Sequence, residues 1–140
     1  MAKLVDARDS KSRGSNTVSV RVRPPAPLRV GMSTDCIFCS ISVGAITAQI
    51  IAHTDDVIVI KDISPKSEYH YLIIPRTHYP DLQAADETTI SKLLRTAQTL
   101  ACENSHLADY RLVINNGFQA GQRVFHLHIH FLAGKSLPEF

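Results

Sequence analysis

The 140-residue sequence has no apolar run that approaches the ~20 residues of a membrane-spanning helix. Its N-terminus also lacks the apolar stretch of a secretory signal. From these two absences we expect no contact with a membrane and a cytoplasmic location. The chain has only three cysteines, and an odd number argues against a disulfide framework. The thiols are therefore available to bind a metal ion.

The sequence does contain enough apolar material for one domain. With 44% hydrophobic residues over 140 positions, it can bury a core without crosslinks. The formal net charge of +2 is divided unequally along the chain. Residues 1–31 carry seven of the 15 Lys and Arg residues and only two of the 13 Asp and Glu residues, so the remainder has a net charge of −3. The body therefore gives no electrostatic reason to expect nucleic-acid binding.

Residues 1–31 form a basic leader that shows no sustained helical or strand period and contains a PPAP run. We expect it to be disordered, and residues 32–140 to form the folded domain. A basic nucleic-acid-binding arm and an organelle transit peptide are alternatives. A third hypothesis is that translation begins at Met32, because Val20–Arg23 can be encoded by DNA that resembles the T-arm of a transfer RNA gene. The intact mass of the native protein tests it.

The body has the pattern of an antiparallel sheet. The stretch CIFCSISVGAI indicates a short helical turn, and three candidate strands follow at Gln49–His53, Asp56–Lys61 and Tyr69–Ile74. Another strand is expected at Arg111–Asn115, before the loop NNGFQAGQ and a histidine-rich segment. Connections as short as those between the first three strands favour antiparallel neighbours.

One long helix lies between these groups of strands. Asp86 can cap it, and it would run for about five turns. Its apolar residues recur at helical spacing: Ile90, Leu93, Leu94, Ala97, Leu100 and Ala101. We expect Cys102 at a buried position of this helix or in a dimer interface. Strands on both sides of one helix predict an α+β fold in which helix covers one face of the sheet.

The segment HLHIHFL places three of the seven histidines, His126, His128 and His130, at alternate positions. In a regular strand these three side chains share one face. The residues between them would point into the core: Leu127, Ile129 and Phe131. Successive imidazoles on a strand face lie roughly 6.5–7 Å apart, which is too far for all three to bind one metal ion comfortably.

Three interpretations of this face remain open at this point. It can be a solvated strand face, a metal site in which two histidines are joined by outside ligands, or a catalytic site. Chemistry favours the last, because neutral imidazole is a good nucleophile toward phosphorus and a neighbouring imidazole has a pKa suited to proton donation. The preceding loop supports it, since Gly117 and Gly121 let the backbone approach an anion.

These residues also resemble a known family. His126-Leu-His128-Ile-His130-Phe-Leu resembles the signature of the histidine triad (HIT) family, in which three histidines alternate with apolar residues. The resemblance covers roughly Cys36 to Gly134, through CIFCSISVGAI, KDISPKSEYHYLIIPRTH and LVINNGFQAGQRVFHLHIH. It is most similar to the Hint branch, the purine-nucleoside phosphoramidases. This implies a five-stranded antiparallel sheet with one long and one short helix, and a homodimer formed through the long helix and an edge strand.

The resemblance further implies a mechanism that needs no catalytic cofactor. His128 would attack the α-phosphorus of a nucleoside 5′-phosphoramidate, and water would hydrolyse the nucleotidyl-histidine intermediate. His130 would lie near the leaving group and protonate it. The backbone carbonyl of His126 would fix the tautomer of His128.

The substrate-binding residues are also inferred from the resemblance. Asp62 and Ile63 would cup the ribose and the base of a purine nucleotide. Asn115 and the backbone of Gly121 and Gln122 would approach the ribose and the α-phosphate.

Arg123 departs from the pattern, because the Hint branch commonly has a serine at this position. A guanidinium group can still hold phosphate, and its permanent charge would favour a longer polyphosphate leaving group. The leading prediction is therefore an adenosine 5′-monophosphoramidase type of hydrolase. The alternatives are a dinucleoside polyphosphate hydrolase and a nucleotide-binding regulatory protein with weak catalysis.

A second group of residues suggests a metal. Cys36-Ile-Phe-Cys39 is a C-x-x-C motif, which indicates a redox pair, half of a zinc site, or two small buried residues in a packed turn. A tetrahedral zinc ion needs two more ligands, and the available histidines are His53, His70, His78 and His126. Some histidine triad proteins take one from a Pro-Lys/Arg-x-His turn and one from the start of the triad. This resemblance predicts a structural zinc site at Cys36, Cys39, His78 and His126.

Overall fold

The computed structural model describes residues 5–6, 36–135 and 137–140. Of the predicted leader, only Val5 and Asp6 are included. The expectations for the rest of residues 1–31, and the proposed start at Met32, lie outside the described residues. No helix in the described part of the chain is long and apolar enough to cross a membrane.

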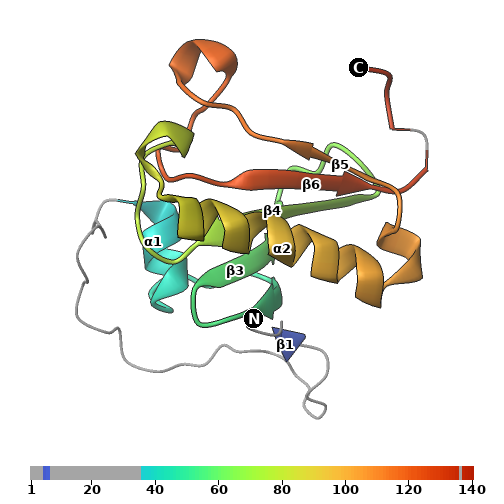
Figure 1. Ribbon diagram of the computed structural model, residues 1–140, viewed down its shortest axis with the longest axis horizontal. Coiled ribbons are helices and arrows are strands. Elements are labelled where there is room, and N and C mark those ends of the chain that lie inside the picture. Colours follow the sequence, from blue (N-terminus) through green and yellow to red (C-terminus); the bar gives the residue numbers. More distant parts are fainter. Residues whose placement is uncertain (1–4, 7–35, 136) are drawn as a thin grey trace.

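The described strands form one antiparallel sheet in the order β1-β2-β3-β4-β6-β5 (Figure 1). They are β1 (Val5–Asp6), β2 (Ile50–His53), β3 (Val57–Lys61), β4 (Tyr69–Pro75), β5 (Tyr110–Val113) and β6 (Ile129–Ala133). The five strands from β2 to β6 are the predicted five-stranded sheet, and the two-residue β1 extends it beside β2. The expected bounds are close for β2 to β4, while β5 begins one residue earlier and ends two residues earlier than predicted.

The two helices pack on opposite faces of the sheet. The long helix α2 (Glu87–Glu103) buries Leu93, Ala97 and Leu100 against one face, where side chains of β3, β4 and β6 complete the main core: Val57, Val59, Ile73, Ile129, Phe131 and Ala133. The short helix α1 (Ile37–Ser42) buries Phe38 and Ile41 against the other face, over the alternate residues of β3 and β4. The α+β prediction is confirmed, and α1 adds a cover on the second face.

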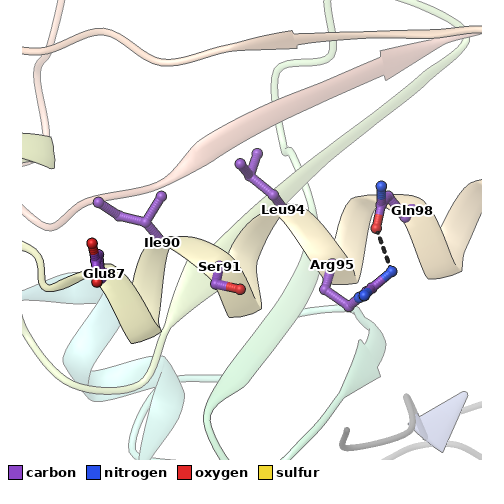
Figure 2. A pocket seen from close by; sticks show the side chains of 6 residues that line it. All are labelled: Glu87, Ile90, Ser91, Leu94, Arg95 and Gln98. Atoms are coloured by element: carbon purple, nitrogen blue, oxygen red, sulfur yellow. Dashed lines mark hydrogen bonds between the residues drawn. The ribbon is translucent and has the colours of Figure 1, made fainter.

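Helix α2 begins as predicted. Asp86 is its N-cap, and the side-chain oxygen accepts a hydrogen bond from the backbone N–H of Thr89 at 2.8 Å. The helix has a second apolar ridge that the core does not use, since Leu94 is 43% exposed. Ile90 and Leu94 project from one side of α2 and line a surface pocket there (Figure 2). Cys102 is exposed, so the expectation of a buried position for it is wrong.

The histidine segment differs from the regular strand that we expected. Strand β6 begins at Ile129, so His126 and His128 precede it. At this point the backbone leaves the ladder, and the N–H of Leu127 donates to the carbonyl of Tyr79 at 2.7 Å. The apolar residues of the segment are buried as predicted: Leu127, Ile129 and Phe131.

Three short 3₁₀ helices complete the structure. They are η2 (Leu82–Ala84), η3 (Ser105–Leu107) and η4 (Phe118–Ala120). The last lies in the glycine-bearing loop before the histidine segment. Gly117 and Gly121, on either side of η4, have φ values of 100° and 108°, which favour glycine.

Candidate functional site

The three histidines of the triad have three different partners. All lie toward the α1 face of the sheet, where the Phe38 ring meets the rings of both His126 and His128. The ring centroids of His128 and His130 are 5.1 Å apart, closer than the roughly 6.5–7 Å expected for a regular strand. The expected spacing is wrong, since it assumed side chains at right angles to a regular strand, whereas His128 precedes β6.

His128 has the arrangement of an oriented nucleophile. Its Nδ1 lies 2.7 Å from the backbone carbonyl oxygen of His126, an atom that only accepts hydrogen bonds, so Nδ1 carries the proton. The lone pair of the neutral ring is then on Nε2, at the opposite corner. Burial lowers the pKa of His128 below 6.5, against the hydrogen bond to His126 and the charge of Asp62. A neutral imidazole with a fixed tautomer is available for attack near neutral pH.

His130 is held by a fourth histidine. His70, from β4, is 3% exposed, and its Nε2 lies 2.9 Å from Nδ1 of His130. The same Nε2 is 3.3 Å from a carboxylate oxygen of Asp62. The backbone N–H of Lys66 donates to Nδ1 of His70 at 2.9 Å. The proton of a neutral His70 is therefore on Nε2, and it can be donated to His130.

This tautomer decides between two interpretations of the group formed by Asp62, His70 and His130. Their ligand atoms lie within 4.8 Å of one another, close enough to hold a metal ion. However, Nε2 of His70 carries a proton and has no lone pair for a metal. We therefore interpret the group as a hydrogen-bonded chain that ends at Nε2 of His130, where the neutral ring carries its own proton.

The charge state of this chain is set by its surroundings. Burial, aided by the nearby His128 and His70 rings, lowers the pKa of His130 to about 4. Burial also lowers the pKa of His70, and the carboxylate of Asp62 opposes that shift. Both rings are neutral at neutral pH, while the carboxylate beside them favours a positive charge whenever another group supplies a proton.

His126 belongs to a separate cluster with Cys36, Cys39 and His78. Its Nδ1 lies 3.3 Å from Sγ of Cys36, 3.5 Å from Sγ of Cys39 and 3.2 Å from Nδ1 of His78. Sγ of Cys39 is 3.4 Å from Nδ1 of His78. A tetrahedral zinc ion with bonds of ~2.1 Å to nitrogen and ~2.3 Å to sulfur separates its ligand atoms by ~3.4–3.8 Å. The four predicted ligands come together with nearly this spacing.

The chemistry of the cluster also fits a metal. The ring of His126 is completely buried, and its Nε2 lies 2.8 Å from the carbonyl oxygen of Pro75. This places the proton on Nε2 and turns the Nδ1 lone pair toward the two sulfur atoms, as when a backbone carbonyl orients a metal-binding histidine. Burial lowers the pKa of His126 to about 4, so the ring is neutral. Cys36 and Cys39 are not joined by a disulfide.

Helix α1 explains why the C-x-x-C motif delivers both sulfur atoms to one point. Cys36 is the N-cap of α1, and its Sγ accepts a hydrogen bond from the backbone N–H of Cys39 at 3.4 Å. Residues three apart at the start of a helix lie on the same side of it. Phe38, between the cysteines in sequence, points at the triad instead.

The residues predicted to bind substrate lie in two segments. Asp62 and Ile63 directly follow β3, and the others lie between β5 and the histidine segment. Ile63 is 98% exposed and follows Asp62, whose second carboxylate oxygen accepts the backbone N–H of Ser64 at 2.7 Å. Asn115 and Gly121 are neighbours, since a Cβ on Gly121 would meet the Asn115 side chain at 3.6 Å.

Gln122 and Arg123 hold the loop together. The Gln122 side chain is buried, accepts the Gly117 N–H at 2.8 Å and donates to the carbonyls of Pro80 and Val124. The backbone N–H of Gln122 also donates, to the carbonyl of Gly117 at 3.0 Å. The Arg123 guanidinium donates to the carbonyls of Phe118 and Gln122 and lies 4.3 Å from the Phe118 ring centroid. Part of the guanidinium is therefore committed to its own loop.

Sequence analysis missed two residues of the site. His70 was considered only as a zinc ligand, although its position in β4 places it opposite Leu132 and beside His130. Alternation along Tyr69–Pro75 was the available signal, because it puts His70 on the same face as Leu72 and Ile74. Phe38 carried no sequence signal, since contact with His128 depends on how α1 packs.

Comparison with known proteins now identifies the family. Residues 43–137 match the family model described as the HIT domain. The chain belongs to this family. It is 39% identical over 107 residues to an uncharacterised HIT-like protein of Synechocystis, covering 74% of this chain and 94% of that protein.

Solved HIT structures share the fold. A HIT family hydrolase from Legionella pneumophila has a TM-score of 0.68 at 32% identity, covering 74% of this chain and 96% of that one. A zinc-bound histidine triad family protein from Mycobacterium smegmatis has a TM-score of 0.65 at 32% identity, covering 70% and 73%. The HIT-like fold that the sequence predicted is thereby confirmed.

Zinc content tests the cluster directly. We expect the purified parent chain to hold about one zinc ion, and Cys36→Ser to lose most of it, because a hydroxyl is a much poorer zinc ligand than a thiolate. Elemental analysis gives the stoichiometry. Cys102→Ser is the matched control, since it removes an exposed thiol outside the cluster and should keep the zinc. Equal zinc in Cys36→Ser and the parent would remove the site.

A nuclear magnetic resonance titration tests the chain of His70 and His130. In the folded protein we expect His130 to titrate near pH 4, well below the ordinary value of ~6.5. Because its pKa is depressed on folding, its contribution to stability is complete above ~6.5 and falls as the pH drops toward 4. His70→Gln removes one opposing ring and should raise the pKa of His130.

His53→Gln, which removes a histidine of β2, is the control for that titration and should leave the pKa of His130 unchanged. A parent midpoint above 6, or the same shift in both variants, would contradict the assignment.

Proposed function

We propose that this HIT protein is a hydrolase that cleaves nucleoside 5′-phosphoramidates through a covalent intermediate on His128. The observation that carries the proposal is the 2.7 Å hydrogen bond from Nδ1 of His128 to the carbonyl of His126. It leaves the Nε2 lone pair as the only nucleophilic atom of a ring that burial keeps neutral. The description of the Legionella relative as a hydrolase supports this reaction class.

The reaction has two steps. Nε2 of His128 forms a bond to the α-phosphorus, the bond from phosphorus to the leaving nitrogen breaks, and the leaving nitrogen takes a proton from Nε2 of His130. Water then attacks the nucleotidyl-histidine, the bond from phosphorus to Nε2 breaks, and the proton lost by water returns to His130. The products are a nucleoside monophosphate and an amine, and both histidines return to their starting state.

The proton for the first step requires a positive His130, whereas its pKa in the free protein is about 4. Substrate binding supplies the difference, because the negative phosphate raises the pKa of a nearby imidazole. The Asp62 carboxylate extends the stabilisation, because its negative charge raises the pKa of both His70 and His130. Asp62 thus serves the proton donor in addition to its proposed place near the ribose.

We further propose that the predicted binding residues receive a purine nucleotide. Ile63 offers an exposed apolar surface for the base, and the Asn115 side chain lies beside Gly121 in the loop before the histidines. The Gln122 side chain keeps this loop in shape. The backbone N–H groups of Gly121 and Gln122 already donate to loop carbonyls, so a phosphate at this place competes for these donors.

Arg123 favours one alternative substrate. A cation in place of the usual serine suits a polyphosphate leaving group, as in a dinucleoside polyphosphate hydrolase. Against this, its guanidinium already donates to two loop carbonyls and covers the Phe118 ring. Phosphoramidates therefore stay the leading proposal. A nucleotide-binding regulatory protein with weak catalysis is the remaining alternative.

Three further features complete the proposal. Zinc at the cluster of Cys36, Cys39, His78 and His126 has a structural role, supported by the ligand spacing and by the zinc-bound Mycobacterium relative. A cytoplasmic location agrees with three cysteines that form no disulfide in the described part of the chain. A homodimer would cover the exposed ridge of α2 and the edge strand β5.

Trapping the intermediate tests the mechanism. The parent chain, incubated with an adenosine 5′-phosphoramidate and quenched, should carry nucleotide mass on the peptide that contains His128. His128→Ala should give no adduct, and its turnover should fall roughly 10³-fold or more. His106→Ala, which removes an exposed histidine, is the control and should behave as the parent does.

Full turnover by His128→Ala would disprove the covalent mechanism, and a parent without turnover or adduct would favour the regulatory alternative. In the same assay, faster cleavage of a diadenosine polyphosphate than of the phosphoramidate would favour the polyphosphate branch.

The dimer has its own test. Leu94→Asp places a charge on the exposed apolar ridge of α2 and should convert the dimer to a monomer, measured by sedimentation. Lys92→Asp changes a residue about half a turn away, where Lys92 meets Asp56, and should leave the dimer intact. A monomeric parent, or dissociation by both substitutions, would contradict this interface.

A further inference from the structure

The proposed nucleophile lies in a segment outside the backbone ladder of the sheet. The described ladder between β4 and β6 ends at the pair of Ile73 and Ile129, so residues 126–128 lie just beyond it. An oriented side chain outside a ladder needs other supports. The contacts of this segment show where they come from.

The buried Leu127 side chain and the bond from Nε2 of His126 to the carbonyl of Pro75 anchor the segment to the core and to β4. Three further contacts bear on the orientation of His128. The carbonyl oxygen of His126 accepts the bond from His128. The N–H of Leu127 donates to the carbonyl of Tyr79 at 2.7 Å. The ring of Phe38 meets the His128 ring edge-on, with 5.1 Å between centroids and 74° between planes.

Each of these three contacts leads to the same four-ligand cluster. His126 is itself a member, through its imidazole. Tyr79 follows the member His78 in sequence. Phe38 lies on α1 between Cys36 and Cys39, which are the remaining members.

We propose that the cluster of Cys36, Cys39, His78 and His126, when it binds zinc, positions His128 for attack and so controls the rate of the covalent step. This inference rests on the proposed function, which makes His128 the nucleophile. The four cluster residues are positioning residues, because four protein ligands complete a tetrahedral ion and leave it no open place for substrate.

The physical reason is the crowding of the ligand atoms. Two sulfur atoms and two ring nitrogens face one another at 3.2–3.5 Å. With an ion between them this spacing is favourable. Without one, only weak hydrogen bonds between thiols and ring nitrogens hold the four side chains together, so their positions are less narrowly fixed. A shift of the His126 backbone moves its carbonyl, and a tilt of α1 moves Phe38. Displacements of ~1 Å near a reacting group can reduce a rate ~100-fold.

Two substitutions at one position separate metal binding from side-chain identity. His78→Ala removes a ligand, whereas His78→Cys gives a set of three cysteines and one histidine, which also binds zinc. We expect His78→Ala to form the His128 adduct at least ~10-fold more slowly than the parent, with the dissociation constant for AMP changed less than ~3-fold. His78→Cys should retain zinc and most of the rate.

A second readout follows the His128 ring without turnover. The proton on Nδ1, bonded to the His126 carbonyl, should give a slowly exchanging nuclear magnetic resonance signal in the zinc-loaded parent. The signal should weaken in His78→Ala and in the parent treated with a chelator, and return when zinc is added. Cys102→Ser, treated in the same way, should follow the parent at every step.

Several results would overturn the inference. They are an unchanged adduct rate and ring signal in the zinc-free chain, a loss of AMP affinity as large as the loss of rate, or a slow His78→Cys that holds a full complement of zinc. Global unfolding of the chelated chain, seen by circular dichroism, would also overturn it, because the metal would then support the whole fold. If the parent forms no adduct, the proposed function fails, and the ring signal alone decides whether the cluster positions His128.

Discussion

The hydrogen bond between Nδ1 of His128 and the carbonyl oxygen of His126 is the interaction on which the site depends. A free imidazole exchanges its proton between two nitrogens, and either can be the nucleophile. A carbonyl at 2.7 Å removes that freedom, because it can only accept. The reactive lone pair then points in one direction, and burial keeps the ring neutral. The orientation depends on backbone that lies outside the β-ladder, so the contacts of that backbone become part of the chemistry.

The three histidines show how one residue type can serve three purposes through its hydrogen bonds. His126 donates from Nε2 to Pro75 and turns Nδ1 toward the cysteines. His128 donates from Nδ1 and leaves Nε2 free, which is the opposite tautomer. His130 accepts at Nδ1 from His70 and keeps a proton on Nε2. The proposed metal ligand, nucleophile and proton donor thus differ mainly in which ring nitrogen carries the proton, and the neighbouring atom determines this.

Much of the fold and part of the site could be predicted from the sequence. The other features could not, because they depend on tertiary contacts. Periodicity located α2 and the body strands, because burial of one face leaves a regular pattern. The ligand set was predicted from family resemblance, since residues as distant as Cys36 and His126 meet only through the tertiary fold. The early start assumed for β6 and the role of Phe38 were not predictable. Both depend on α1 packing and on the bond from Leu127 to Tyr79, which leave no periodic signal.

The position of α1 accounts for the layout of the site. Burial of Phe38 and Ile41 against the sheet stabilises the helix in this position. That packing alone would tolerate a small shift along the sheet, because apolar contact is not directional. In the proposed zinc site, the cysteine that caps α1 and the one a turn later would remove this tolerance, since a tetrahedral ligand set accepts only narrow distances. This directional constraint, added to the non-directional packing, would then locate Phe38, and with it the space beside His128, more narrowly than the core does.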